Sequence, residues 1–178
     1  MITKIIIAGF GGQGVIAAGK TLAYAAMKEN KEVTYFPSYG AEMRGGTCNC
    51  SVIISDDKIA NPIIDSPDIA IILNKPSKDK FEKSVKKGGI ILINKTLVDE
   101  VLHRDDIEGK FVEATKIAEN TGSLKATNMV VLGAFSKISR IIKLDSLISS
   151  LKDVFPNFND KLMDLNVKAL KNGFDSIE

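Results

Sequence analysis

A glycine-rich junction near the N-terminus constrains the fold of this chain most. The apolar run Ile2 to Ala8 ends at Gly9-Phe10-Gly11-Gly12-Gln13-Gly14, and an alanine-rich periodic segment follows. This order predicts a strand, a glycine turn and a helix in G-x-G-x-x-G spacing, which permits a tight turn and close helix-to-strand packing. A helix beginning near Gln13 would direct free N–H groups towards an anion or a partner's polar edge. We therefore expect a partner- or ligand-facing glycine corner, formed by Gly9, Gly11, Gly12, Gln13 and Gly14.

The same spacing occurs in dinucleotide-binding sites, where an acidic residue about 20 positions on binds the ribose at the end of the second strand. Here the second predicted strand, Glu32 to Phe36, continues into Phe36-Pro37-Ser38. Glu32 lies at the wrong end of that strand, and Glu42 lies beyond it in a loop. A self-standing NAD(P)-dependent oxidoreductase therefore remains an alternative, although the acidic residue that would bind the ribose is missing from the expected position.

A phosphate-binding P-loop pattern, G-x-x-x-x-G-K-[ST], runs from Gly14 to Thr21. Its intervening residues, Val15 to Ala18, are apolar helix formers, so Lys20 is expected in mid-helix. The later apolar strands end in Asn74 and Asn94 instead of a magnesium-binding Asp. A P-loop nucleotidase is the less favoured alternative.

Length, charge and the apolar runs limit which functional classes remain. The length of 178 residues fits one domain, 1–178, and a net charge of +2 gives no electrostatic footprint for nucleic acid or an anionic membrane. The apolar runs are far shorter than a membrane span, and the N-terminal run lacks the longer core of a signal peptide. We expect a cytoplasmic protein that binds neither nucleic acid nor membrane.

The candidate metal and redox residues are few. The chain has two cysteines, Cys48 and Cys50, fewer than the four thiolates that hold an iron–sulfur cluster. At i and i+2 they would share one face of a strand, so we interpret them as structural. His103 lies among charged residues without a triad partner and is expected at the surface. No metal site is expected on this chain.

A second glycine-rich segment, from Pro37 to Gly46, follows the second strand and contains one acidic and one basic side chain. In a doubly wound sheet the first two strands are parallel neighbours, so this loop and the glycine corner would emerge side by side at the carboxyl edge. An ordinary surface loop is the alternative. The residues expected to face a partner or ligand are Tyr39, Gly40, Glu42, Met43, Arg44, Gly45 and Gly46.

The rest of the chain predicts the architecture. Thr47 to Ser55 followed by Asp56-Asp57 predicts a hairpin, and the lysine-rich helix Lys75 to Lys86 is expected to have a solvated side. From Ala126 onward the pattern is helical only, with Gly173 expected to end the last helix. The fold class is α/β, a Rossmann-like doubly wound and mostly parallel sheet with an added β-hairpin and a helical C-terminal part.

Several segments together carry a family resemblance that covers nearly the whole chain. Gly9 to Val15 and Tyr39 to Gly46 resemble the gamma subunit of 2-oxoacid:ferredoxin oxidoreductases. Similar likeness is found in Leu73 to Ser77, Asn128 to Gly133 and Asn166 to Gly173. The run Glu42 to Thr47 with Cys50 most resembles the 2-oxoglutarate type.

The resemblance implies a non-catalytic structural subunit near the active site of a heteromeric enzyme. In this family thiamine diphosphate with Mg belongs to the alpha and beta subunits, and iron–sulfur clusters belong to beta or delta, so no cofactor is expected on this chain. The assembled enzyme oxidatively decarboxylates a 2-oxoacid, here expected to be 2-oxoglutarate, reduces ferredoxin and transfers the acyl group to coenzyme A. The loop from Tyr39 to Gly46, including Arg44, is then expected to face a partner subunit or coenzyme A.

Overall fold

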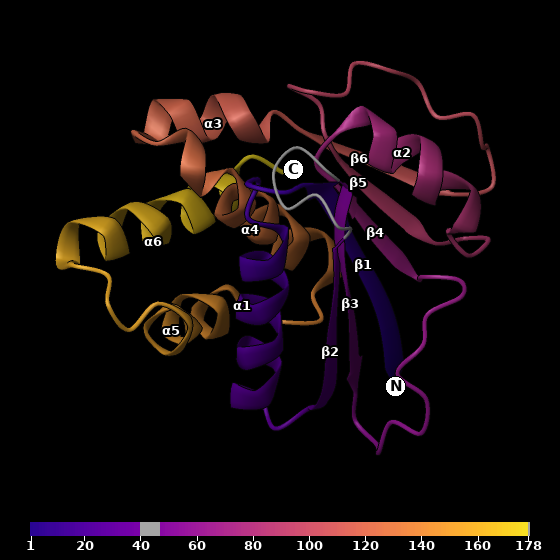
Figure 1. Ribbon diagram of the computed structural model, residues 1–178, viewed down its shortest axis with the longest axis horizontal. Helices are drawn as coiled ribbons and strands as arrows, with labels where there is room; N and C mark the ends of the chain where they lie inside the picture. Colours follow the sequence, from indigo (N-terminus) through magenta and orange to yellow (C-terminus); the bar gives the residue numbers. More distant parts are fainter. Residues whose placement is uncertain (40–46, 178) are drawn as a thin grey trace.

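The computed structural model describes residues 1–39 and 47–177, with Tyr39 described by its backbone alone. Six strands form one mixed sheet in the order β2-β3-β1-β4-β5-β6 (Figure 1). The strands are β1 (Ile2–Phe10), β2 (Glu32–Tyr39), β3 (Thr47–Ser55), β4 (Ile69–Ile72), β5 (Ile90–Asn94) and β6 (Glu108–Val112). The helices are α1 (Val15–Lys28), α2 (Lys75–Phe81), α3 (Ala114–Thr121), α4 (Thr127–Ser139), α5 (Leu144–Val154) and α6 (Asp160–Asp175), with short 3₁₀ turns η1 (Glu82–Ser84) and η2 (Leu124–Ala126).

The parallel half of the sheet consists of β1, β4, β5 and β6. Ile5 of β1 pairs with Ile69 of β4, which pairs in turn with Ile90 of β5. β4 is apolar throughout because helices or loops cover both of its faces, as expected for a parallel strand. The predicted α/β class, with a mostly parallel sheet, an antiparallel hairpin and C-terminal helices, is confirmed.

Two details of the predicted sheet are wrong. β3 lies between β1 and β2 and is antiparallel to both, so the first two strands are not neighbours. β3 forms its hairpin with β2, and no strand follows Asp56-Asp57 before β4. A strand has only two edges, and β1 and β2 already occupy both edges of β3. The segment from 58 to 68 therefore has no place beside it.

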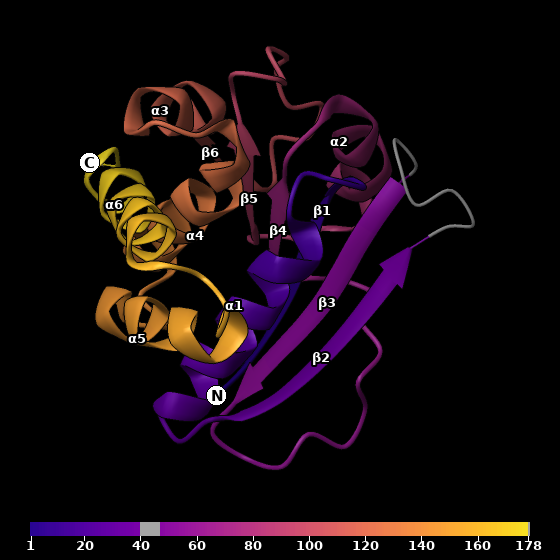
Figure 2. The same ribbon diagram turned by 60° about the vertical axis from the view of Figure 1, so that its left-hand side comes forward.

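The helices divide unequally between the two faces (Figures 1 and 2). α1, α3, α4, α5 and α6 pack on one face over the larger core, which includes Ile5, Ile7 and Leu92. α2 and the segment from 95 to 107 cover the other face over a smaller core that includes Ile6, Ile72 and Ile93. Successive residues of each central strand thus supply two cores, as the period of two requires.

The C-terminal helical part is held by a close crossing of α4 and α6. A Cβ added to Gly173 would lie 1.9 Å from the Val130 carbonyl oxygen, and one added to Gly133 would lie 1.9 Å from that of Leu170. Gly173 lies inside α6 and does not end it, contrary to the sequence expectation. Its absent side chain lets the two helix backbones touch.

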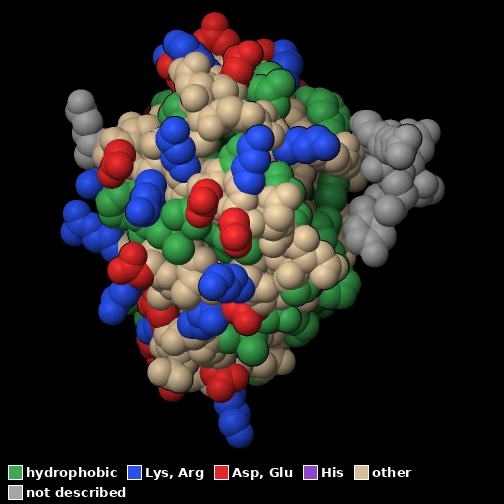
Figure 3. All heavy atoms as spheres, turned by 90° about the vertical axis from the view of Figure 1, so that its left-hand side faces the viewer, with side chains coloured by type: hydrophobic (Ala, Val, Ile, Leu, Met, Phe, Trp, Pro, Cys, Tyr) green, Lys and Arg blue, Asp and Glu red, His purple; other side chains and the backbone are tan. Residues whose placement is uncertain are grey.

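Charged side chains are distributed without a dominant sign over the outer side of α3, α5 and α6. Lys and Arg alternate there with Asp and Glu (Figure 3), in keeping with the 24 basic and 22 acidic residues. In the part of the chain that the structure describes, no helix is long and apolar enough to span a membrane.

Candidate functional site at the carboxyl edge of the sheet

The glycine corner lies where β1 ends, at the carboxyl edge of the parallel strands. Gly12 has φ 100° and Gly14 has φ 74°, both in the left-handed region that favours glycine. Gly14 caps α1, which begins at Val15, two residues later than the sequence predicts. A Cβ on Gly9 would lie 2.7 Å from Gln13 Oε1, so Gly9 is required by close packing.

Gln13 is turned into the protein instead of facing outward. Its Oε1 accepts hydrogen bonds from the Phe10 backbone N–H at 2.7 Å and from Asn74 Nδ2 at 3.1 Å. Its Nε2 donates to the Leu73 carbonyl oxygen at 3.4 Å. The side chain therefore braces the corner against the end of β4 and offers little to a ligand.

Asn128, at the start of α4, holds the other side of the corner. Its Nδ2 donates to the Gly14 carbonyl oxygen at 3.1 Å, and the Met129 backbone N–H donates to its Oδ1 at 3.0 Å. A Cβ on Gly14 would lie 2.5 Å from that Nδ2, so glycine and asparagine fit each other. Asn128 has no predicted role beyond the family resemblance, because its partner Gly14 lies 114 positions away in the sequence.

Asparagines also follow the next two parallel strands. Asn74 Oδ1 accepts from the Ser77 backbone N–H at 2.9 Å and caps α2. Asn94 Oδ1 accepts from the Thr115 backbone N–H at 3.3 Å at the start of α3. α1, by contrast, has no side-chain cap among residues 1–39 and 47–177. Of these three helices, α1 has the N-terminus best suited to a polar group from outside the chain.

A hollow of about 340 Å³ lies beside the corner. Phe155 and Phe158 stack at 4.6 Å between ring centroids in its wall. The amides of Asn128 and Asn166 lie at its edge, and Gly14 and Ala17 at its α1 side. The arrangement places an apolar surface next to the backbone amides of α1.

The second predicted segment reaches the same edge. Tyr39, the last residue of β2, pairs with Cys48, which also pairs with Gly9. Thr47, the first residue of β3, pairs with Phe10. Both ends of the loop therefore lie at the edge where the corner lies, although β3 separates the two strands. The residues from the prediction that lie outside the described part are Gly40, Glu42, Met43, Arg44, Gly45 and Gly46.

The P-loop pattern lies within a helix, as expected, and both cysteines are buried in the sheet. Val15 to Ala18 form the first turn of α1, and Lys20 lies within that helix. Cys48 and Cys50 are free and buried, and burial raises the pKa of the Cys50 thiol to about 12. Such a thiol is a poor nucleophile at neutral pH. Among the described residues no group of three or more metal-type ligands occurs.

One buried charged pair was not predicted, because the lysines of α2 were expected to be solvated. Lys78 is 0% exposed, and its Nζ lies 3.2 Å from Glu82 Oε2 and 3.7 Å from Glu100. Glu82 Oε1 in turn accepts from the backbone N–H groups of His103 and Arg104. The i, i+4 spacing of Lys78 and Glu82 was the available signal. The pair ties α2 to the segment around the exposed His103.

Comparison with known proteins identifies related chains. Residues 4–176 match the family model described as pyruvate ferredoxin/flavodoxin oxidoreductase. The ketoisovalerate oxidoreductase subunit VorA of Methanothermobacter marburgensis is 37% identical over 174 residues, which cover 97% of this chain and 36% of that protein. This chain thus spans about a third of the length of VorA.

Two further proteins are similar over nearly their whole length. The 2-oxoglutarate synthase subunit KorC of Methanocaldococcus jannaschii is 33% identical over 178 residues, covering 98% of this chain and 94% of KorC. The crystal structure of a keto/oxoacid ferredoxin oxidoreductase gamma subunit from Geobacter sulfurreducens has a TM-score of 0.83 at 28% identity. That match covers 98% of this chain and 97% of the other.

Proposed function

Because this chain belongs to the pyruvate ferredoxin/flavodoxin oxidoreductase family, we propose that it is the gamma subunit of a heteromeric 2-oxoacid:ferredoxin oxidoreductase. The observation that carries the proposal is the coverage of its relatives. The chain corresponds to 94% of KorC and 97% of the Geobacter gamma subunit, but to only 36% of VorA. Residues 1–178 therefore correspond to nearly the whole of two relatives, one of which is a gamma subunit by name. We also propose that residues 1–178 form one domain, since both hydrophobic cores pack against the same sheet. We propose in addition that this domain is cytoplasmic.

The chain's own role in this proposal is structural. Gln13, Asn74 and Asn128 are engaged in internal hydrogen bonds at the carboxyl edge, which suits a rigid docking element better than an acid–base site. The partners are the alpha, beta and delta subunits. In this proposal they carry thiamine diphosphate, Mg and the iron–sulfur clusters, and the assembly uses coenzyme A and ferredoxin.

The surface that meets the partners is the carboxyl edge. The glycine corner presents the N-terminus of α1, and the loop after Tyr39 starts and ends at the same edge. Open α/β sheets form their binding crevice at this edge. We therefore propose that the corner and the loop from Tyr39 to Gly46 face a partner subunit or coenzyme A, with Arg44 as the charged contact.

The substrate is a 2-oxoacid, and 2-oxoglutarate is the first candidate. The run Glu42 to Thr47 with Cys50 favours it, and KorC carries 2-oxoglutarate synthase in its name. Ketoisovalerate is the second candidate, because VorA is the more identical of the two relatives. The kcat/KM values of the assembled enzyme for 2-oxoglutarate, ketoisovalerate and pyruvate distinguish the candidates.

The function is tested by anaerobic reconstitution of the complex with and without this chain. We expect 2-oxoacid- and coenzyme A-dependent reduction of ferredoxin only when the chain is present. Full activity without it would overturn the proposal. Titration of the isolated chain with NAD, NADP and ATP provides a second arm, in which tight saturable binding of any of them would favour a self-standing nucleotide enzyme.

A further inference from the structure

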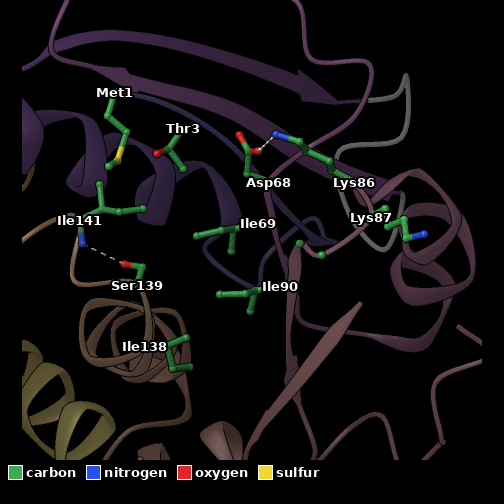
Figure 4. Close-up of a pocket in the computed structure, with 12 residues that line it drawn as sticks. Met1, Thr3, Asp68, Ile69, Lys86, Lys87, Ile90, Ile138, Ser139 and Ile141 are labelled. Atoms are coloured by element: carbon green, nitrogen blue, oxygen red, sulfur yellow. Dashed lines mark hydrogen bonds and ion pairs between the residues drawn. The ribbon is translucent and has the colours of Figure 1, made fainter. Parts of the chain in front are cut away.

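A second hollow lies at the opposite, amino edge of the sheet (Figure 4). Its volume of about 380 Å³ is within the range of small-molecule sites. Figure 4 shows Thr3, Ile69 and Ile90 from three neighbouring strands facing Ile138 and Ile141 across it. The hollow thus lies open to solvent between the larger core's face of the sheet and the end of α4.

The hollow exists because α4 stops before it has covered the sheet. α4 ends at Ser139, and Arg140 takes a left-handed conformation with φ 55°, which turns the chain away. Ser136 Oγ donates to the Ile142 carbonyl oxygen at 2.8 Å and fixes that turn. The amino-end row of β1, β4 and β5 is therefore left without a helix above it.

Thr3 is the polar member of this otherwise aliphatic row. Thr3 is 8% exposed, and its hydroxyl makes no hydrogen bond to any residue of 1–39 or 47–177, but its oxygen is not fully buried. Water therefore reaches this hydroxyl, and a ligand group that displaces the water would accept the same hydrogen bond. Ser139 Oγ, on the opposite wall, accepts from the Ile141 backbone N–H at 3.3 Å, and its own hydrogen remains free to donate.

The mouth of the hollow is positively charged. Lys86 neutralises Asp68 at 2.9 Å, and the other Asp68 oxygen accepts from the Lys4 backbone N–H. Lys87 lines the hollow, forms no ion pair with any described residue and points its amine outward in Figure 4, and its charge contributes to lowering the pKa of Asp106. Its flexible stem allows it to turn over the mouth.

We propose that this hollow binds a small aliphatic carboxylate. The hydrocarbon body would lie against Ile69, Ile90, Ile138 and Ile141, and the carboxylate would accept from Thr3 and pair with Lys87. This site is separate from the carboxyl edge and does not depend on the proposed function.

The test measures binding of 4-methylpentanoate to the full chain by calorimetry, with its neutral amide as the matched ligand. We expect saturable millimolar binding of the acid and about tenfold weaker binding of the amide. Thr3→Val, which removes the hydroxyl and keeps the shape, should weaken binding of the acid by about fivefold to tenfold. Lys87→Gln, which removes an exposed charge, should weaken it by about twofold to fivefold. Thr3→Ser should retain binding, as should Lys95→Gln, an exposed lysine at the opposite edge.

Three results would overturn the proposal. They are the absence of saturable binding, equal affinity for acid and amide, and affinity unchanged in both Thr3→Val and Lys87→Gln. Thr3→Val must keep the wild-type thermal midpoint, and Lys87→Gln provides the same test without touching the core. Loss of binding in the assembled complex would also overturn the proposal, because it would mean that a partner chain fills the hollow.

Discussion

Asn74 donates a hydrogen bond from Nδ2 to Oε1 of Gln13 at 3.1 Å, and this contact joins the carboxyl ends of β1 and β4. The same Gln13 oxygen receives the Phe10 backbone N–H, and the same Asn74 side chain caps α2. One pair of amides therefore fixes both the glycine corner and the start of the following helix. The corner is held rigid from within.

Replacing Gln13 by alanine should destabilise the chain by about 1 to 3 kcal/mol, because the Phe10 N–H loses its partner. Urea unfolding of Gln13→Ala, Asn74→Ala and the double variant measures the coupling between the two amides. We expect the double variant to cost less than the sum of the singles, by about 0.5 kcal/mol or more. Strict additivity would mean that the two side chains act independently.

Much of this arrangement was predictable from sequence, because it depends on local spacing. The strand, glycine turn and helix around Gly9 to Gly14 were predictable, as was the placement of Lys20 within a helix. The inward orientation of Gln13 was not, since it depends on Leu73 and Asn74, about 60 positions away. The insertion of β3 between β1 and β2 was not predictable either. The pattern of apolar residues shows that these segments are strands, but it does not show which strands pair.

Gly14 and Gly88 provide a matched pair, since both have φ 74°. Alanine at either position incurs the left-handed conformation cost of about 1 to 2 kcal/mol. A Cβ at Gly88 meets nothing within 4 Å, whereas one at Gly14 meets Asn128 Nδ2 at 2.5 Å. Gly14→Ala should therefore lower the free energy of unfolding more than Gly88→Ala does. Equal losses in chemical denaturation would argue against the fit between Gly14 and Asn128.

Lys78→Met should destabilise the chain by about 3 to 5 kcal/mol, because it leaves the buried Glu82 carboxylate without its cation. The control is Lys80→Met on the exposed side of α2, for which we expect a change within about 0.5 kcal/mol. Adding Glu82→Gln to Lys78→Met should recover part of the loss. Thermal unfolding of the three variants measures this, and similar midpoints for the two lysine variants would contradict a buried pair.

We expect ionisation of the buried Cys50 thiol to lower the free energy of unfolding at high pH. Burial raises the pKa of its thiol from 9.0 to about 12, so folding favours the neutral form. This contribution is fully present below about pH 9 and is lost as the pH rises towards about 12. The free energy of unfolding should fall less steeply above pH 9 in Cys50→Ala than in wild type. Rapid alkylation of native Cys50 at neutral pH would contradict its burial.

Arg44→Ala tests the loop that the sequence assigns to the partner surface. A loop arginine contributes little to a core, so we expect the isolated chain to keep its stability within about 0.5 kcal/mol. Assembly or coenzyme A use should weaken by about 2 to 5 kcal/mol if Arg44 pairs with a buried anion across the interface. Complex formation and the KM for coenzyme A are measured in the reconstituted enzyme, and wild-type values for both would remove Arg44 from the site.

The central claim, that this chain is a subunit of a 2-oxoacid:ferredoxin oxidoreductase, is tested most directly by isolating it with its partners from its native cell under anaerobic conditions. We predict stoichiometric co-purification with chains that contain thiamine diphosphate and iron–sulfur clusters, and that the purified assembly reduces ferredoxin with a 2-oxoacid and coenzyme A. Recovery of the chain only as a homo-oligomer, active by itself on some small molecule, would contradict the claim.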